Sequence, residues 1–222
     1  MRMRKKKRLS ERFEACSDVL IEINIESLNL NDEIDIGRFD CQSFFGNSNP
    51  VHLEIGCGKG QFVIETAKRY PEINFIAVEK TKNVIVTALE NALEQNIKNV
   101  RFINCGAEYL KGYFDEKVIE RIYLNFSCPY PKKKYTKHRL THENFLKLYK
   151  KVLVPHGEIH LKTDNTSFFE YTINSLCDFG FTLKNVTFDL HHSDFEGNIV
   201  TEYEQRFSDM GCPIYRLEAY LK

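Results

Sequence analysis

The amino-acid sequence predicts a single α/β domain whose doubly wound sheet is mostly parallel, with an antiparallel last strand. From residue 51 onward, short β-rich runs alternate with segments whose apolar residues recur at helical spacing, a pattern typical of strand–helix–strand units. A turn with glycine at every second position follows the first β-rich run, and α/β proteins hold nucleotide-like ligands at such turns. A chain of 222 residues also suits one domain.

The β-rich runs are the predicted strands, at residues 51–55, 74–78, 100–103, 119–126, 159–163, 181–190 and 215–221. The amphipathic segments between them are the predicted helices, at residues 62–70, 84–93, 145–153 and 168–179. The pattern is irregular before residue 51, where a helix is expected near residues 13–20 and a loop ends at Pro50. We therefore expect residues 1–50 to form a basic N-terminal extension and residues 51–222 to form the α/β domain.

The 31 basic and 31 acidic residues balance, but they are unevenly distributed. Residues 1–12 hold seven Lys or Arg side chains against one acid, Glu11. Such a run is either a solvated tail or an arm that binds the phosphates of a nucleic acid, and the run alone does not decide between them.

The seven cysteines are scattered, and no Cys-x-x-Cys pair occurs. This spacing argues against a zinc site and a disulfide framework, so we expect no bound metal and a reducing, cytoplasmic location. No apolar stretch approaches the roughly 20 residues that a membrane helix needs. The basic N-terminal run also lacks the apolar segment of a secretory signal. We therefore expect no membrane partner.

The glycine turn reads Glu-x-Gly-x-Gly-x-Gly at residues 54–60, which differs from the dinucleotide and P-loop patterns. Glycine suits backbone with a positive φ and backbone that approaches a ligand closely. Glu54 is placed to meet a cationic group of a bound cofactor, and a solvated acid at the strand end is the alternative. Glu79 ends the second predicted strand, where an acid accepts hydrogen bonds from ribose hydroxyls. The alternative for Glu79 is an ion pair with Lys80 or Lys82.

A basic loop follows the fourth predicted strand. Two prolines in residues 125–131 exclude a helix or a central strand, and no acid interrupts residues 129–142. The loop belongs to the carboxyl edge of the sheet, so its lysines can neutralise phosphates and its tyrosines can stack on an exposed base. We expect Tyr130 to be the stacking residue, and a solvated loop is the alternative.

Two further segments of the sequence contain candidate functional residues. Asp164 follows the fifth predicted strand, where it either faces a ligand or caps the next helix. Residues 201–204 lie in a polar connection between the last two strands and carry no signal by themselves.

Several segments together match one known family. They are residues 1–4, 53–62, 79, 123–127, 139–141, 160–165, 196–204 and 211–216. On these segments the chain resembles the bacterial tRNA (guanine-N7-)-methyltransferases nearly end to end. Residues 162–165 (Lys-Thr-Asp-Asn) and 196–198 (Glu-Gly-Asn) are the most specific parts, whereas many methyltransferases share the glycine turn.

The resemblance implies a class I, Rossmann-like methyltransferase domain at residues 51–222. Its expected activity is transfer of a methyl group from S-adenosylmethionine to N7 of a guanine in the variable loop of tRNA. The implied cofactor contacts come from Glu54, Gly56, Gly58, Gly60, Glu79, Gly106, Ala107 and Cys128. The implied contacts with guanine or tRNA come from Lys132, Asp164, Thr201, Glu202, Tyr203 and Glu204, with RNA backbone contacts from Lys134, Tyr135, Thr136, Lys137, His138 and Arg139. Asp164 and the residue at position 128 are the implied catalytic positions, and the oligomeric state is left open between monomer and homodimer.

The chain departs from the family pattern at two positions. Cys128 replaces the Asp of the family's Asp-Pro-Trp-Pro-Lys loop, and Gly106 replaces an Asp after the third strand. Asn104 or Glu108 is the expected substitute for the second carboxylate. The main alternative to the enzyme is therefore a tRNA-binding paralogue with weakened or lost catalysis.

Overall fold

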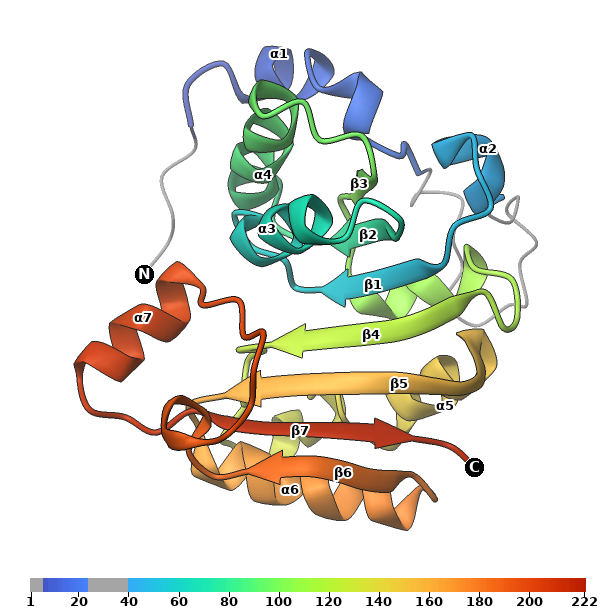
Figure 1. Cartoon of the computed structure of the whole chain (residues 1–222). Coiled ribbons are helices and arrows are strands. Elements are labelled where there is room, and N and C mark those ends of the chain that lie inside the picture. The colour runs from blue at the N-terminus through green and yellow to red at the C-terminus, as the bar shows by residue number, and fades with distance from the viewer. Residues whose placement is uncertain (1–5, 24–39) are drawn as a thin grey trace.

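The computed structural model describes residues 6–23 and 40–222. Their centre is a seven-stranded sheet with the order β3-β2-β1-β4-β5-β7-β6 (Figure 1). The strands are β1 (Val51–Ile55), β2 (Asn74–Val78), β3 (Val100–Ile103), β4 (Ile119–Asn125), β5 (Leu153–Thr163), β6 (Thr182–Thr187) and β7 (Tyr215–Tyr220). Only β7 runs against its neighbours, since β5 and β6 both pair with it in antiparallel register while the other pairs are parallel. The predicted fold class is confirmed.

Helices cover both faces of the sheet (Figure 1). The helices α3 (Gln61–Arg69) and α4 (Lys82–Glu94) lie over β1, β2 and β3 on one face, and α5 (Glu143–Val152) and α6 (Thr166–Asp178) lie behind the other half of the sheet. The predicted helices are thus present, with ends shifted by a few residues. No helix in the described part of the chain has the length and apolar character that a membrane crossing requires.

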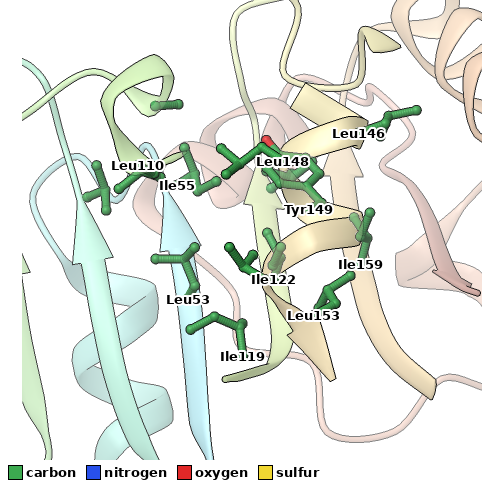
Figure 2. Packing of buried hydrophobic residues seen from close by; sticks show 14 of the residues in the cluster. Leu53, Ile55, Leu110, Ile119, Ile122, Leu146, Leu148, Tyr149, Leu153 and Ile159 are labelled. Atoms are coloured by element: carbon green, nitrogen blue, oxygen red, sulfur yellow. The ribbon is translucent and has the colours of Figure 1, made fainter. Parts of the chain in front are cut away.

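The main hydrophobic core lies between the sheet and α5 (Figure 2). Leu53 and Ile122 of the strands belong to the same buried cluster as Leu146 and Tyr149 of α5, and all four are almost inaccessible to solvent. These strands are buried on both faces, which is why the sequence shows them as nearly continuous apolar runs.

Part of the predicted N-terminal extension packs on α4. The expected helix near residues 13–20 is instead α1 (Leu9–Glu14) followed by a 3-10 turn (Ser17–Val19). Arg12 makes a bidentate ion pair with Glu90 of α4, with Nε 2.6 Å from Oε1 and Nη2 2.6 Å from Oε2. The first five residues of the proposed phosphate-binding arm lie outside the described residues, and a short helix, α2 (Cys41–Phe45), was not predicted.

The fifth strand begins earlier than predicted. It starts at Leu153, directly after α5, and passes through Pro155 before it reaches the predicted segment. A shift in the register between β4 and β5 accommodates this irregular beginning, and proline is tolerated in a sheet at such a bulge. The error arose because the Pro-His-Gly run at residues 155–157 is typical of a turn.

Candidate active site

A cavity of about 380 Å³ opens at the carboxyl ends of β1 and β4, next to the helix α7 (Glu202–Asp209). Its walls bring together the glycine turn, the end of β4 and the start of α7, which are far apart in the sequence. The lining residues are Glu54, Gly56, Cys57, Gly58, Lys59, Gln61, Phe62, Val84, Asn125, Phe126, Thr201, Glu202, Tyr203 and Arg206. The predicted cofactor segment and the predicted substrate segment therefore share one cavity.

The three glycines of the turn have positive φ values of 86°, 59° and 81° at Gly56, Gly58 and Gly60. The turn is tied to β2, because the N–H groups of Gly56 and Cys57 both donate to the Val78 carbonyl, at 2.7 and 3.0 Å. A Cβ on Gly56 or Gly58 would meet no atom within 4 Å, so these two positions leave open space. Gly60 differs, because a Cβ there would lie 2.7 Å from the Cβ of Ala88 in α4.

This difference predicts unequal effects of two matched substitutions. Gly58→Ala should carry only the cost of alanine at positive φ, about 1–2 kcal/mol. Gly60→Ala carries that cost and a collision with the buried Ala88, so it should lower the free energy of unfolding by about 2 kcal/mol more. Urea unfolding of both variants measures the gap, and equal stabilities would show that α3 and α4 move apart freely.

Glu54 lies at the end of β1 with its carboxylate buried. One oxygen, Oε1, accepts a hydrogen bond from Asn125 Nδ2 at 3.0 Å, while the buried Oε2 has no hydrogen-bond partner among the described residues. Burial raises the pKa of Glu54 to about 7, although Asn125 and the charge of Lys162 oppose the shift. The alternative of a solvated surface acid is therefore wrong, and Asn125 is a supporting residue that the sequence analysis missed.

Glu79 and Asn104 mark the carboxyl ends of β2 and β3. Asn104 Nδ2 donates to the Glu79 carbonyl at 2.7 Å, and one Glu79 carboxylate oxygen accepts from the Thr81 N–H at 2.8 Å. In the part of the chain that the structure describes, Glu79 forms no ion pair with Lys80 or Lys82. The carboxylate thus stands beside the glycine turn, although it does not line the cavity itself.

The space beside Gly106 is occupied. A Cβ at this position would lie 2.5 Å from Oε2 of Glu108, so the Glu108 carboxylate sits directly over the glycine. Ala107 next to it is buried. Of the two expected substitutes for the family Asp, Glu108 has its carboxylate next to Gly106, whereas the Asn104 amide donates to the Glu79 carbonyl. The compensation for the family Asp stays a prediction.

The loop after β4 has a strained backbone, which an arginine side chain inside the loop stabilises. Phe126 and Tyr130 have positive φ values of 50° and 41°, which non-glycine residues rarely adopt. Arg139 donates from Nε to the Pro129 carbonyl at 2.9 Å and from Nη2 to the Tyr130 carbonyl at 3.2 Å, and its guanidinium lies 4.3 Å from the Tyr171 ring centre. Arg139 therefore braces the loop, a role that the sequence analysis missed in favour of an RNA contact.

Aromatic rings and lysines alternate on the outside of this loop. The His138 ring lies 5.6 Å from the Tyr130 ring and 6.1 Å from the Tyr135 ring, between centroids. The predicted backbone-contact residues are exposed except Thr136 and Arg139, which are half-buried. Among the ion pairs of the described residues, none involves Lys132, Lys134 or Lys137. The loop presents unpaired positive charge next to stacking surfaces.

Asp164 is not the helix cap that one reading of the sequence allowed. Asn165 has that role, because its side chain accepts a hydrogen bond from the Phe168 N–H at 2.8 Å. The pKa of Tyr203 is raised, first by burial and then by the charge of Asp164, while the charge of Arg206 opposes the shift. Tyr203 lines the cavity, whereas Asp164 and the exposed Cys128 are not among its lining residues.

The segment 201–204, predicted as a polar connection, begins α7. Thr201 caps the helix by accepting from the Glu204 N–H at 3.0 Å, and Tyr203 stacks near Phe126 with 5.1 Å between ring centroids. Glu202 is exposed and pairs with Lys59 at 2.9 Å. The expectation that Glu204 faces the substrate is wrong, because its side chain is completely buried.

A second cavity of about 280 Å³ lies over the sheet between α3 and residues 195–199. Its residues Glu158, His160 and Glu218 place ligand atoms within 4.8 Å of one another, as a metal site would. Both carboxylates already form ion pairs with arginines: Arg121 Nη2 lies 3.2 Å from Glu158, and Arg216 Nη2 donates a hydrogen bond to Glu218. The cluster is explained by ion pairing, and the absence of a bound metal stays a prediction.

Comparison with known proteins agrees with this geometry. Residues 48–217 match the family model described as "Putative methyltransferase". A "tRNA (guanine-N(7)-)-methyltransferase" of Geobacillus sp. (strain WCH70) is 48% identical over 98% of this chain and 94% of its own length. The protein with the same description from Geobacillus thermodenitrificans (strain NG80-2) is 52% identical over 79% of this chain and 81% of its own.

Solved structures show the same fold at low sequence identity. An antibiotic-related methyltransferase superposes with a TM-score of 0.59 at 15% identity, covering 87% of this chain and 97% of its own. A precorrin-6y C5,15-methyltransferase from Geobacter metallireducens GS-15 superposes with a TM-score of 0.55 at 14% identity, covering 99% and 94%. These structures share the fold, and the sequence relatives show that this protein belongs to the tRNA (guanine-N7-)-methyltransferase family.

Proposed function

We propose that this protein transfers a methyl group from S-adenosylmethionine to N7 of a guanine in the variable loop of tRNA. The observation that carries the proposal is the shared cavity, in which Glu54 and the glycine turn face the first turn of α7. A relative described by this activity matches 98% of the chain.

The residues of the cavity fit the cofactor. Glu54 offers a buried carboxylate oxygen without a partner among the described residues, which suits the cofactor's ammonium group. Gly56 and Gly58 leave room for close approach, and Glu79 offers a carboxylate for ribose hydroxyls. When bound, S-adenosylmethionine supplies an electrophilic methyl group on a cationic sulfur.

For this reaction, the main task of the protein is to align the methyl donor with guanine N7. Guanine N7 carries a lone pair and no proton, so no general base is required. Holding the two reactants in line can contribute about 7–11 kcal/mol. Positive charge spreads onto the guanine imidazole during transfer, and Asp164 is the proposed residue that stabilises it. Cys128 stands near the same site but supplies no carboxylate.

We assign the basic loop to the tRNA. The guanine must leave its stack to reach the cavity, and Tyr130 is the proposed surface that receives it. Lys132, Lys134 and Lys137 would neutralise phosphates beside it. We also propose that the protein works in the cytoplasm, as a monomer or a homodimer.

The inactive paralogue is the weaker reading. Gly106 leaves no gap, because the Glu108 carboxylate fills the adjacent space. Asn165 caps the helix α6, so the Asp164 carboxylate is not used as the cap. We propose that it stabilises the transition state. Neither substitution removes a group that the reaction needs absolutely.

A methylation assay tests the proposal directly. Unmodified tRNA transcripts incubated with the protein and radiolabelled S-adenosylmethionine should gain one methyl group, recovered as 7-methylguanosine. Transcripts made with 7-deazaguanosine lack the N7 nucleophile and should stay unlabelled. Label that persists in the deaza transcripts, or no label in the normal ones, would contradict the proposal.

A further inference from the structure

The helix α7 (Glu202–Asp209) forms one wall of the cavity but is not held by an apolar stripe. Surface helices normally bury a hydrophobic face against the core. In α7 the one buried residue is Glu204, whose side chain is inaccessible to solvent. The position of the cavity wall therefore depends on what this carboxylate contacts.

Glu204 is the centre of a closed polar network. Its Oε2 accepts a hydrogen bond from Lys162 Nζ at 2.6 Å, and its Oε1 accepts from Asn198 Nδ2 at 2.6 Å. His191 Nε2 lies 3.1 Å from the same Oε1. Lys162 also donates to Asn198 Oδ1 at 3.1 Å and to the Ile199 carbonyl at 3.0 Å, so the three protons of its ammonium group have three acceptors.

Lys162 connects this network to the reacting centre. It lies on β5 two residues before Asp164, and its register partner on β4 is Asn125. Asn125 in turn donates to Glu54, the proposed cofactor ligand. A continuous set of contacts thus runs from Glu54 through two neighbouring strands to Glu204 in α7.

The exposed ion pair of the α7 first turn is too weak to replace the Lys162–Glu204 pair. Lys59 and Glu202 form an ion pair at 2.9 Å, but their side chains are 61% and 74% exposed. Exposed pairs of this kind contribute little because water and salt screen them. The Lys162–Glu204 pair is shielded from both, with 7% and 0% exposure.

We propose that Lys162 and Glu204 are a positioning pair that sets Tyr203 and the α7 wall against Asp164 and Glu54. The inference rests on the proposed methyl transfer only for its effect on rate. A buried ion pair stabilises a fold little better than apolar residues of the same size, whereas it fixes a specific geometry. The pair therefore serves placement more than stability.

Variants separate these two roles. Lys162→Met and Glu204→Gln each leave a buried group without its partner, so both should lower the melting temperature and the catalytic efficiency. The double variant Lys162→Met/Glu204→Leu removes both charges, so its melting temperature should return close to wild type. Its kcat/KM should stay roughly 10- to 100-fold low, because a displaced wall misaligns the reactants. An exposed ion pair provides the control, and Lys68→Met/Glu65→Gln should change neither quantity.

A fluorescence reporter makes the test independent of activity. The chain has no tryptophan, so Tyr203→Trp places a single probe on the cavity wall. Its emission should shift to the red and its quenching by acrylamide should rise in the Lys162→Met/Glu204→Leu background, but not in the control background. Unchanged emission together with wild-type kcat/KM would overturn the positioning role. If the emission shifts but the protein methylates no tRNA, the proposed function is contradicted, while the positioning role of the pair is still supported.

Discussion

Glu54→Gln is expected to weaken S-adenosylmethionine binding by about 100-fold, because truncating one partner of a buried charge pair costs 2–5 kcal/mol. The amide keeps the shape of the side chain and the contact with Asn125, but it cannot pair with the cofactor's ammonium group. Calorimetric titration measures the loss. Binding as tight as in the wild type would remove Glu54 from the cofactor site.

The same substitution should stabilise the protein without ligand. Burial holds the pKa of Glu54 at about 7, above its ordinary value of 4.5, so the folded state keeps a proton that the unfolded state has lost. The penalty is absent below pH 4.5, grows as the pH rises and is complete above pH 7. It amounts to about 3 kcal/mol, which corresponds to roughly 6–12 °C in melting temperature at this size.

Thermal unfolding of Glu54→Gln and the wild type should therefore differ most at pH 8 and converge toward pH 4.5. For the wild type, cofactor affinity should fall as the pH drops through about 7, since the neutral carboxyl no longer attracts the ammonium. Glu79→Gln is the matched control, because its side chain is only half-buried. It should weaken binding without raising the melting temperature, and an equal gain in both variants would contradict the burial argument.

The strands and the cofactor turn could be predicted because local sequence determines them. Parallel strands buried on both faces are short apolar runs, and the glycines have positive φ values that other residues avoid. The carboxyl ends of parallel strands meet at one edge, so Glu54 and Asp164, 110 residues apart in sequence, could be assigned to the same edge of the sheet.

What could not be predicted depends on tertiary contacts. The helix α7 has no apolar stripe, so its pattern resembled a polar loop, and nothing local reveals that Glu204 is buried on Lys162. Arg139 belongs to a basic run, and only the folded loop turns its guanidinium inward to two carbonyls. Glu204 was interpreted as a substrate contact because its internal partner, Lys162, lies 42 residues away in the chain.

Asp164→Asn should lower kcat by about 100-fold while the KM for S-adenosylmethionine changes little, since a single charge aimed at the transition state contributes 10²–10³ in rate. Both side chains have the same shape, so alignment of the guanine is preserved and only the stabilising charge is lost. Because Cys128 occupies the position of the family Asp, Cys128→Asp in the Asp164→Asn background should restore part of the rate.

The neighbouring Asn165 provides the control for this substitution. Asn165→Ala removes the cap of α6 and should cost about 1 kcal/mol of stability with kcat unchanged. If Asn165→Ala lost as much rate as Asp164→Asn, the effect would lie in the helix start and not in the charge. If Asp164→Asn kept the full rate, alignment of the reactants alone would account for catalysis. The replacement of the family Asp by Cys128 would then have no effect on the chemistry.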